Sequence, residues 1–193
     1  MSFFTLSYIL LWLLVAFESI VLVLVLRELG VIYLGRRDAF ERDGPDIGKP
    51  LPALQAYANG GTPRTLADLP GDVRALLFGG VGCRLCGPAM EKFERWSDRV
   101  PGLAAVMLME RSDDSTMPTA AGTRNGQEHE TWWIQQGEMF RAFGVRVSPY
   151  AVLVDAQGDV VSKGLVNHHS DIKRLIKEAR DARQRNRVVA ASA

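Results

Sequence analysis

Cysteine is scarce in this 193-residue sequence, which contains only Cys83 and Cys86. Secreted domains held together by disulfides contain more cysteines, spaced so that they close longer loops. A pair with two intervening residues closes almost no loop, so its cross-link contributes little stability. The pair therefore requires a chemical explanation, which is either thiol–disulfide exchange or metal binding.

The sequence also has few histidines and almost no net charge. There are 3 histidines, and 23 Lys and Arg stand against 22 Asp and Glu, for a formal net charge of +1. A nucleic-acid-binding domain has a clear basic surplus, so we expect no nucleic-acid partner. The basic stretch 173–187 is expected to be the solvated face of a last helix. The 47% of hydrophobic and 23% of charged residues are typical of a folded, globular chain.

One long hydrophobic run, Phe3–Leu26, contains a single ionisable residue, Glu18. As a helix it would be about 36 Å long, more than the roughly 30 Å of a bilayer core. It lacks the basic start and the small-residue cleavage site of a secretory signal peptide. The run predicts a single-pass transmembrane anchor at residues 1–28.

No Lys or Arg precedes this run, whereas Arg27, Arg36, Arg37 and Arg42 follow it. The positive-inside rule therefore favours a cytoplasmic location for the domain that follows. The other orientation is favoured by the resemblance described below.

The remaining chain is expected to form one domain at 48–185, between a juxtamembrane connector at 29–47 and a C-terminal tail at 186–193. Gly and Pro residues mark the end of the connector. Apolar runs predict strands, and apolar residues three and four apart predict helices. The strands are expected at 74–79, 103–109, 150–155 and 160–166, and the helices at 86–100, 132–143 and from Ser170 onward.

This order predicts an α/β fold. A helix joins the first two strands, which are therefore parallel, and the last two strands form an antiparallel hairpin. The result is a mixed central sheet with helices on both faces. Ser170 is the expected N-cap of the last helix, and the segment 111–130 is expected to be a surface insertion. The last helix is expected to bury Ile172, Leu175, Ile176 and Ala179.

The cysteine pair follows a buried strand and a short Gly-rich loop, at the expected start of a helix. Unpaired N–H groups there favour a thiolate over a thiol, so the pKa of Cys83 is expected to lie below 8.5. Cys83 is then the nucleophile, and Cys86, about one turn along, resolves the mixed disulfide. Arg84 adds a cation between them, and Gly82 precedes the pair. We include both among the expected substrate contacts.

A second hypothesis uses the same thiols as a metal site. A copper- or zinc-binding chaperone would add His168 or His169, which follow a predicted strand. A structural zinc site requires four ligands, and soft ligands must be placed closely. We therefore expect no metal and no cofactor.

Ser148 and Pro149 directly precede the third predicted strand. If their peptide bond is cis, the surrounding fold maintains it in that conformation. The backbone of Ser148 could then lie beside the cysteine pair and bind an extended substrate segment.

The chain resembles the thioredoxin superfamily in its order of strand, loop, CxxC motif and helix, and in its Ser-Pro before a hairpin. The stretches Gly48–Pro52 and Leu66–Leu69 are similar to its membrane-anchored TlpA-type branch. The anchor and Lys163–Asn167 are similar to the methylamine-utilisation accessory proteins of the MauD family. The resemblance covers nearly the whole chain.

The resemblance implies a thiol–disulfide oxidoreductase in which Cys83 attacks, Cys86 resolves and Pro149 is the cis-proline. It implies a soluble domain on the extracytoplasmic, periplasmic side, client proteins with thiols or disulfides, and a redox partner that recycles the pair. It also implies a role in the maturation of an exported, disulfide-rich dehydrogenase subunit. The sequence departs from the family at Gly82, where thioredoxins have Trp, and at Arg84-Leu85, where a Pro is usual. Because this dipeptide influences the reduction potential, the net direction of the reaction stays open.

Overall fold

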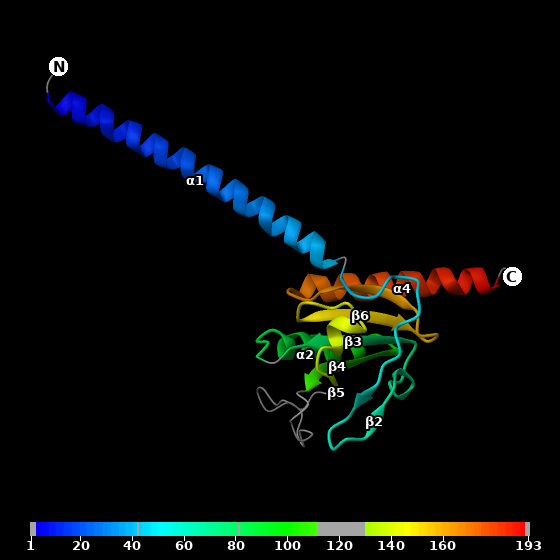
Figure 1. Cartoon of the computed structure of the whole chain (residues 1–193). Coiled ribbons are helices and arrows are strands. Elements are labelled where there is room, and N and C mark those ends of the chain that lie inside the picture. Colours follow the sequence, from blue (N-terminus) through cyan, green and yellow to red (C-terminus); the bar gives the residue numbers. More distant parts are fainter. Residues whose placement is uncertain (1–2, 42, 81, 112–129, 192–193) are drawn as a thin grey trace. The chain divides into compact units, whose positions relative to one another are not determined.

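The structure, a computed structural model, describes residues 3–41, 43–80, 82–111 and 130–191. These residues form two compact units, Met1–Ala39 and Phe40–Ala193. The first is almost entirely one helix, and the second contains all the strands (Figure 1).

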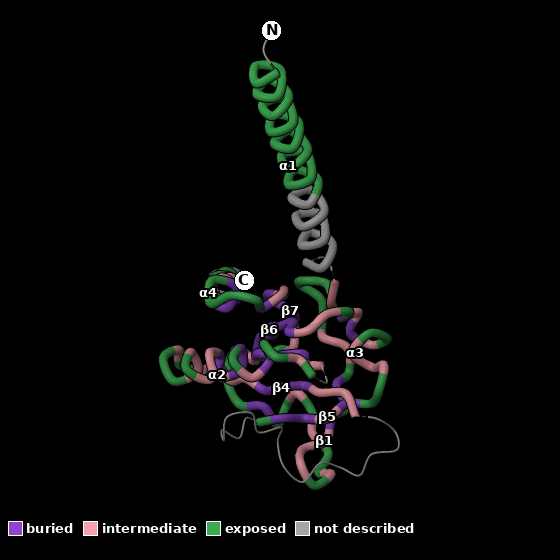
Figure 2. Tube along the Cα trace, turned by 90° about the vertical axis from the view of Figure 1, so that its left-hand side faces the viewer, coloured by how far each residue is buried: buried purple, intermediate pink, exposed green. Residues whose placement is uncertain are grey.

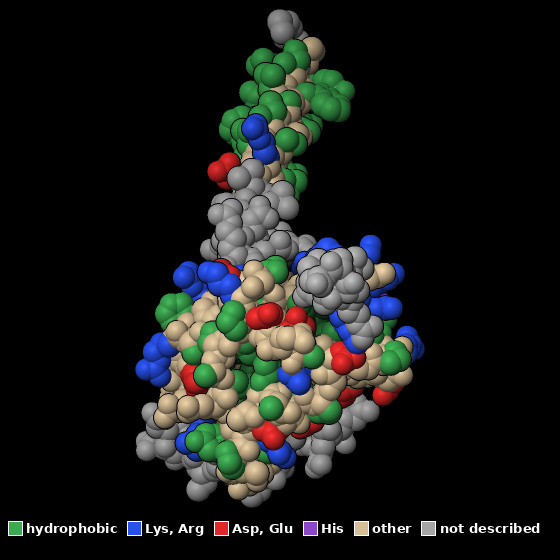
Figure 3. All heavy atoms as spheres, turned by 90° about the vertical axis from the view of Figure 1, so that its right-hand side faces the viewer, with side chains coloured by type: hydrophobic (Ala, Val, Ile, Leu, Met, Phe, Trp, Pro, Cys, Tyr) green, Lys and Arg blue, Asp and Glu red, His purple; other side chains and the backbone are tan. Residues whose placement is uncertain are grey.

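The helix α1 extends over Phe3–Glu41, so the helix predicted for Phe3–Leu26 is confirmed. Within it, Phe3–Glu28 is long and apolar enough to cross a membrane, by length and composition. Apolar side chains cover this part of the helix (Figure 3). Residues 29–41, predicted to be part of a connector, continue the helix.

The second unit is built on a seven-stranded mixed sheet in the order β2-β1-β5-β4-β3-β6-β7. The strand β3 lies in the interior of the sheet, parallel to β4 and antiparallel to β6. The strand β5 is parallel to β4, and β7 completes an antiparallel hairpin with β6. The bounds are β1 Ala56–Tyr57, β2 Pro63–Arg64, β3 Val73–Gly79, β4 Leu103–Arg111, β5 Thr131–Gln135, β6 Tyr150–Asp155 and β7 Val160–Leu165.

Helices cover both faces of the sheet, as predicted. On one face lie α2 (Cys86–Ser97) and α4 (His169–Ala191), and on the other lies the short α3 (Glu138–Arg141) (Figure 2). A one-turn 3₁₀ helix, Leu66–Asp68, lies in the segment before β3. The four residues predicted to be buried on α4, Ile172, Leu175, Ile176 and Ala179, are buried, and so is Asp171.

The helix predicted at 132–143 is wrong. Its first part is the strand β5, and Gly137, with φ +78°, separates that strand from α3. Pairing with β4 buries Trp132, while the ring nitrogen of Trp133 donates a hydrogen bond to Asn59 Oδ1 at 2.9 Å. Trp132 and Ile134, two residues apart, are both buried, which is the spacing of a strand. Of the insertion predicted at 111–130, residues 112–129 lie outside the described residues.

The N-cap predicted at Ser170 is also wrong, because α4 already begins at His169. The side chain that stabilises this helix start is Asp171. Its Oδ2 accepts backbone N–H groups of Asn167 and His168 at 3.1 and 2.9 Å. A carboxylate in the first helical turn is also favoured by the helix dipole.

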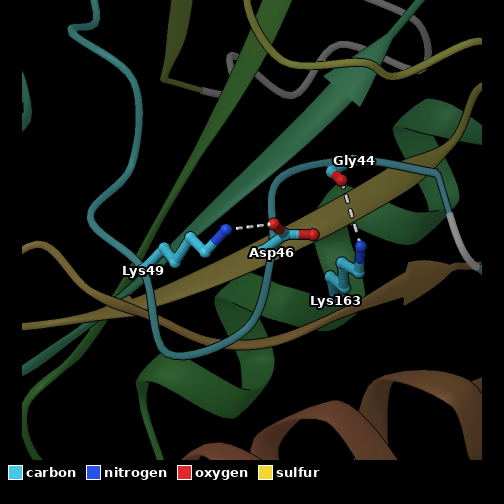
Figure 4. A network of polar contacts seen from close by, with 4 residues as sticks. All are labelled: Gly44, Asp46, Lys49 and Lys163. Atoms are coloured by element: carbon cyan, nitrogen blue, oxygen red, sulfur yellow. Dashed lines mark hydrogen bonds and ion pairs between the residues drawn. The ribbon is translucent and has the colours of Figure 1, made fainter.

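The segment that enters the folded unit is held along the sheet by hydrogen bonds. The backbone of Gly48 donates to Val160 O at 2.8 Å, and Val160 donates to Lys49 O at 2.9 Å. The Lys163 ammonium donates to Gly44 O at 3.0 Å, beside the exposed ion pair of Asp46 and Lys49 (Figure 4). Burial lowers the pKa of Lys163, and Asp46 partly opposes this effect. Residues 44–49 are thus bonded to the sheet, although the sequence placed most of them in a connector.

Candidate functional site

The two cysteines lie where the strand β3 passes into α2. They form a disulfide with a Cα–Cα distance of 5.6 Å. The N–H of Cys83 donates to Gly80 O at 3.0 Å, which closes a turn at the end of the strand. The helix begins at Cys86 with Leu85 as its N-cap, so Cys83 precedes the helix rather than starting it.

The two cysteines differ in exposure. Cys83 is half-buried, whereas Cys86 is 3% exposed and belongs to the core cluster of α2, α4 and the sheet. Cys83 is therefore the more exposed residue of the disulfide, and Cys86 lies within the core. This is the asymmetry that an attacking and a resolving cysteine require.

Sulfur and apolar atoms surround Cys86 on the sheet side. Gly79, the last residue of β3, has no side chain, and the space above it is filled by thioethers. A Cβ on Gly79 would lie 2.6 Å from Met109 Sδ, 3.3 Å from Met107 Sδ and 3.5 Å from Cys86 Sγ. Flexible methionines commonly fill such gaps. A larger residue at position 79 would have to displace these flexible methionine side chains, which lie beside the Cys86 sulfur.

The structure brings the predicted Ser148–Pro149 segment to the cysteine turn. The Ser148–Pro149 bond is cis. A Cβ on Gly80 would lie 2.8 Å from Ser148 Oγ, so the serine side chain lies against the residue whose carbonyl Cys83 binds. Pro149 is buried, and its carbonyl accepts the N–H of Val166 at 3.0 Å. Ser148 and the disulfide thus form one continuous site.

The other two expected contacts, Gly82 and Arg84, are both exposed on the cysteine turn. Gly82 has φ +76°, and a Cβ there would meet no atom within 4 Å. The backbone conformation therefore favours glycine, while the space above it is open. Both residues are placed where an approaching protein would meet them.

The histidines of the metal hypothesis lie at the start of α4. His169 packs its ring near Trp96 of α2, at 6.3 Å between ring centroids. Among the described residues, no three His, Cys, Asp or Glu side chains are grouped as metal ligands.

A groove next to the site was not predicted from the sequence. It lies between the first turns of α2 and α4, which are about 80 residues apart in the chain and meet only in the folded structure. No local motif indicates it, because each side contributes only a few ordinary residues. The lining residues are Leu85, Pro88, Ala89, Lys92, Val166, Asn167, His168 and Ile172.

Comparisons with known proteins agree with this architecture. No family model matches the chain. The methylamine utilization protein MauD of Paracoccus denitrificans is 28% identical over 184 residues, which cover 93% of this chain and 90% of that protein. MauD of Paracoccus versutus is 26% identical, with 92% and 89% covered. The chain is thus similar to MauD over most of its length.

Solved structures share the fold at low identity. A thioredoxin-like protein from Aeropyrum pernix has a TM-score of 0.52 at 15% identity, covering 65% of this chain and 88% of its own. A protein assigned as the thiol:disulfide interchange protein DsbE of Chlorobium tepidum has a TM-score of 0.54 at 19% identity, covering 71% and 97%. The predicted thioredoxin-like fold is confirmed.

Proposed function

We propose that this chain is a membrane-anchored thiol–disulfide oxidoreductase that acts through Cys83 and Cys86 on exported client proteins. The observation that carries the proposal is the disulfide itself, with a half-buried Cys83 before α2 and a buried Cys86 at its first residue. The thioredoxin-like fold and the similarity to MauD support it.

Each half of the reaction exchanges one disulfide for another. In the oxidising direction, a client thiolate attacks Cys83 Sγ and the Cys86 thiolate leaves, which forms a mixed disulfide. A second client thiolate then attacks the client sulfur of this bond and releases Cys83. The client loses two electrons and two protons, and the cysteine pair gains them. In the reducing direction the Cys83 thiolate attacks a client disulfide, and Cys86 resolves the product.

The elements around the pair have separate tasks in this proposal. The turn from Gly80 to Cys83 presents the reactive sulfur, and Ser148 offers its backbone to an extended client segment. Gly82 and Arg84 border the approach, where the Arg84 cation favours a thiolate form of the neighbouring cysteine. No cofactor is required, because the electrons pass between sulfur atoms. A separate redox partner restores the pair after each turnover.

The reduction potential of the full chain, equilibrated with glutathione, tests the proposal. We expect the pair to cycle between dithiol and disulfide. A value near about −120 to −180 mV would indicate a disulfide donor or isomerase, and a value near about −270 mV a reductant. A pair that does not exchange with glutathione would contradict the proposal, and titration with copper and zinc would then be the next measurement.

We also propose that the folded unit lies on the extracytoplasmic side, with a client in methylamine dehydrogenase maturation. Similarity to MauD supports this, whereas the arginines after the hydrophobic run favour the cytoplasm. The measurement is labelling of reduced spheroplasts with a membrane-impermeant maleimide. We expect labelling of intact spheroplasts and none in a variant without both cysteines. Labelling that appears only after lysis would place the domain in the cytoplasm.

A further inference from the structure

Two residues just beyond the end of α1, Asp43 and Gly44, contact the loop 144–149, which carries Ser148 to the cysteine turn. At the start of this loop, the backbone N–H of Gly44 donates a hydrogen bond to Gly144 O at 3.1 Å. Asp43 and Gly44 are both half-buried. They were expected to belong to a connector, but their contacts make them part of the folded unit.

The same two residues contact the far end of the loop at Tyr150, which follows Pro149 and is 0% exposed. The Tyr150 hydroxyl donates a hydrogen bond to Asp43 O. The ring lies so close to Gly44 that a Cβ there would be 2.9 Å from Tyr150 Cε1 and 3.1 Å from the hydroxyl oxygen. A residue with a side chain at position 44 would therefore have to displace the buried ring.

Asp43 and Gly44 have two further contacts, one to the middle of the loop and one to the sheet. Asp43 Oδ1 lies 3.8 Å from Arg146 Nε, and because the arginine side chain is 64% exposed this ion pair contributes little stability. On the sheet, the Lys163 ammonium of β7 donates to Gly44 O at 3.0 Å (Figure 4). The two residues are thus bonded to the sheet and contact the loop at its start, its middle and its end.

Ser148 connects this loop to the cysteine turn. A Cβ on Gly80 would lie 2.8 Å from Ser148 Oγ, and Gly80 O accepts the N–H of Cys83. Ser148 is two residues before Tyr150, so a displaced tyrosine changes the position of the backbone that faces Gly80. A continuous series of contacts therefore extends from Asp43 to the turn that holds the disulfide.

We propose that Asp43 and Gly44 are positioning residues for thiol–disulfide exchange. They hold the loop 144–149 so that the Ser148 backbone lies beside Cys83 in the geometry that a polypeptide disulfide requires. Both act through Tyr150 and the loop, not on the sulfur atoms. This inference rests on the proposed function and adds to it the juxtamembrane residues that set the geometry of exchange.

The variants Gly44→Ala and Gly48→Ala, in the full chain in lipid nanodiscs, form a matched pair. Both glycines precede the sheet and have similar left-handed φ values, +78° and +82°. A Cβ at position 48 would meet no atom within 4 Å, whereas one at position 44 would meet the Tyr150 ring. The two variants therefore have similar backbone strain, and only Gly44→Ala displaces the tyrosine.

The measurement compares two substrates of the reduced protein that release the same thiol. One is a peptide whose single cysteine is joined by a disulfide to 2-mercaptoethanol, and the other is bis(2-hydroxyethyl) disulfide, which has no peptide backbone. We measure the second-order rate of 2-mercaptoethanol release from each. We expect Gly44→Ala to lower the ratio of the peptide rate to the small-disulfide rate about fivefold, the effect of one weakened hydrogen bond. Gly48→Ala should leave this ratio unchanged. A ratio within one variant cancels differences in folded fraction between variants.

Tyr150→Phe is a second, milder variant, because it keeps the buried ring and removes the hydroxyl that is bonded to Asp43 O. Its matched control is Tyr57→Phe on β1, which β5, β4 and β3 separate from β6 in the sheet. We expect Tyr150→Phe to lower the same ratio about threefold and Tyr57→Phe to leave it unchanged.

An unchanged ratio in Tyr150→Phe, with both substrates still reacting, would overturn the positioning role, whether or not Gly44→Ala folds. An equal fall in Gly44→Ala and Gly48→Ala would also overturn it, because backbone strain and not the contact with Tyr150 would be the cause. In both cases the proposed function stands. If the unaltered chain reacts with neither disulfide, the proposed function fails and the inference fails with it.

Discussion

Replacing Cys83 with serine abolishes thiol–disulfide exchange with client proteins, and replacing Cys86 with serine traps them. Cys83 is the half-buried cysteine of the pair, so its loss removes the sulfur that a client can reach. We expect the exchange rate to fall by about a thousandfold or more, as when other catalytic nucleophiles are removed. The measurement is turnover of a disulfide-linked peptide by the full chain.

Cys86→Ser should behave differently, because Cys86 is 3% exposed and its proposed task is to resolve the mixed disulfide. Without it, Cys83 still attacks, but release depends on a second, external thiol. Covalent complexes should therefore accumulate and disappear on addition of a reductant, as seen on non-reducing gels. Equal trapping by both variants, or turnover that survives Cys83→Ser, would contradict the assigned roles. Ser97→Ala, at the far end of α2, is a suitable control, since only its hydroxyl bond to Phe93 O is lost.

Phe93→Ala is the substitution that we expect to destabilise the folded unit most. The phenyl ring is fully buried on α2, in the cluster that also contains Cys86 and residues of the central sheet. Removing a buried phenyl ring typically costs about 3–5 kcal/mol, from lost transfer free energy and the cavity left behind. The free energy of unfolding in urea, measured with and without the substitution, checks this value.

Arg95→Ala is the matched control on the same helix. Arg95 is exposed and forms a single i,i+4 ion pair with Glu91. Its replacement should change the free energy of unfolding by less than about 0.5 kcal/mol. If Phe93→Ala costs no more than Arg95→Ala, then α2 is not held by its buried face. The position of Cys86 would in that case need another explanation.

Much of the fold could be predicted because its signals are local. Continuous apolar runs predicted β3, β4, β6 and β7, and the spacing of apolar residues predicted α2 and the buried face of α4. The prediction failed where pairing partners are distant. Trp132 and Ile134 are two residues apart, which is the spacing of a strand, and they lie in β5, paired with β4.

The candidate site also has features that the sequence predicted and features that depend on distant segments. A strand, a Gly-rich loop and a CxxC motif lie within a few residues of one another, so the place of the cysteine pair between strand and helix was evident from the chain alone. The cis bond of Pro149 and the approach of Ser148 to Gly80 depend on how β6 lies beside β3. The groove needs α2 and α4 on the same face of the sheet, and no single segment encodes this.

By itself, the sequence determined that this protein has a long apolar N-terminal helix, an α/β domain and one closely spaced pair of cysteines. Each of these follows from the hydrophobicity and spacing of neighbouring residues, which act within a few turns or strands. Only the tertiary structure decided which cysteine is exposed, what lies against it and which charges surround it. Residues from several segments that are distant in the chain together determine the exposure and the charge at the site. Packing of the core brings these segments together.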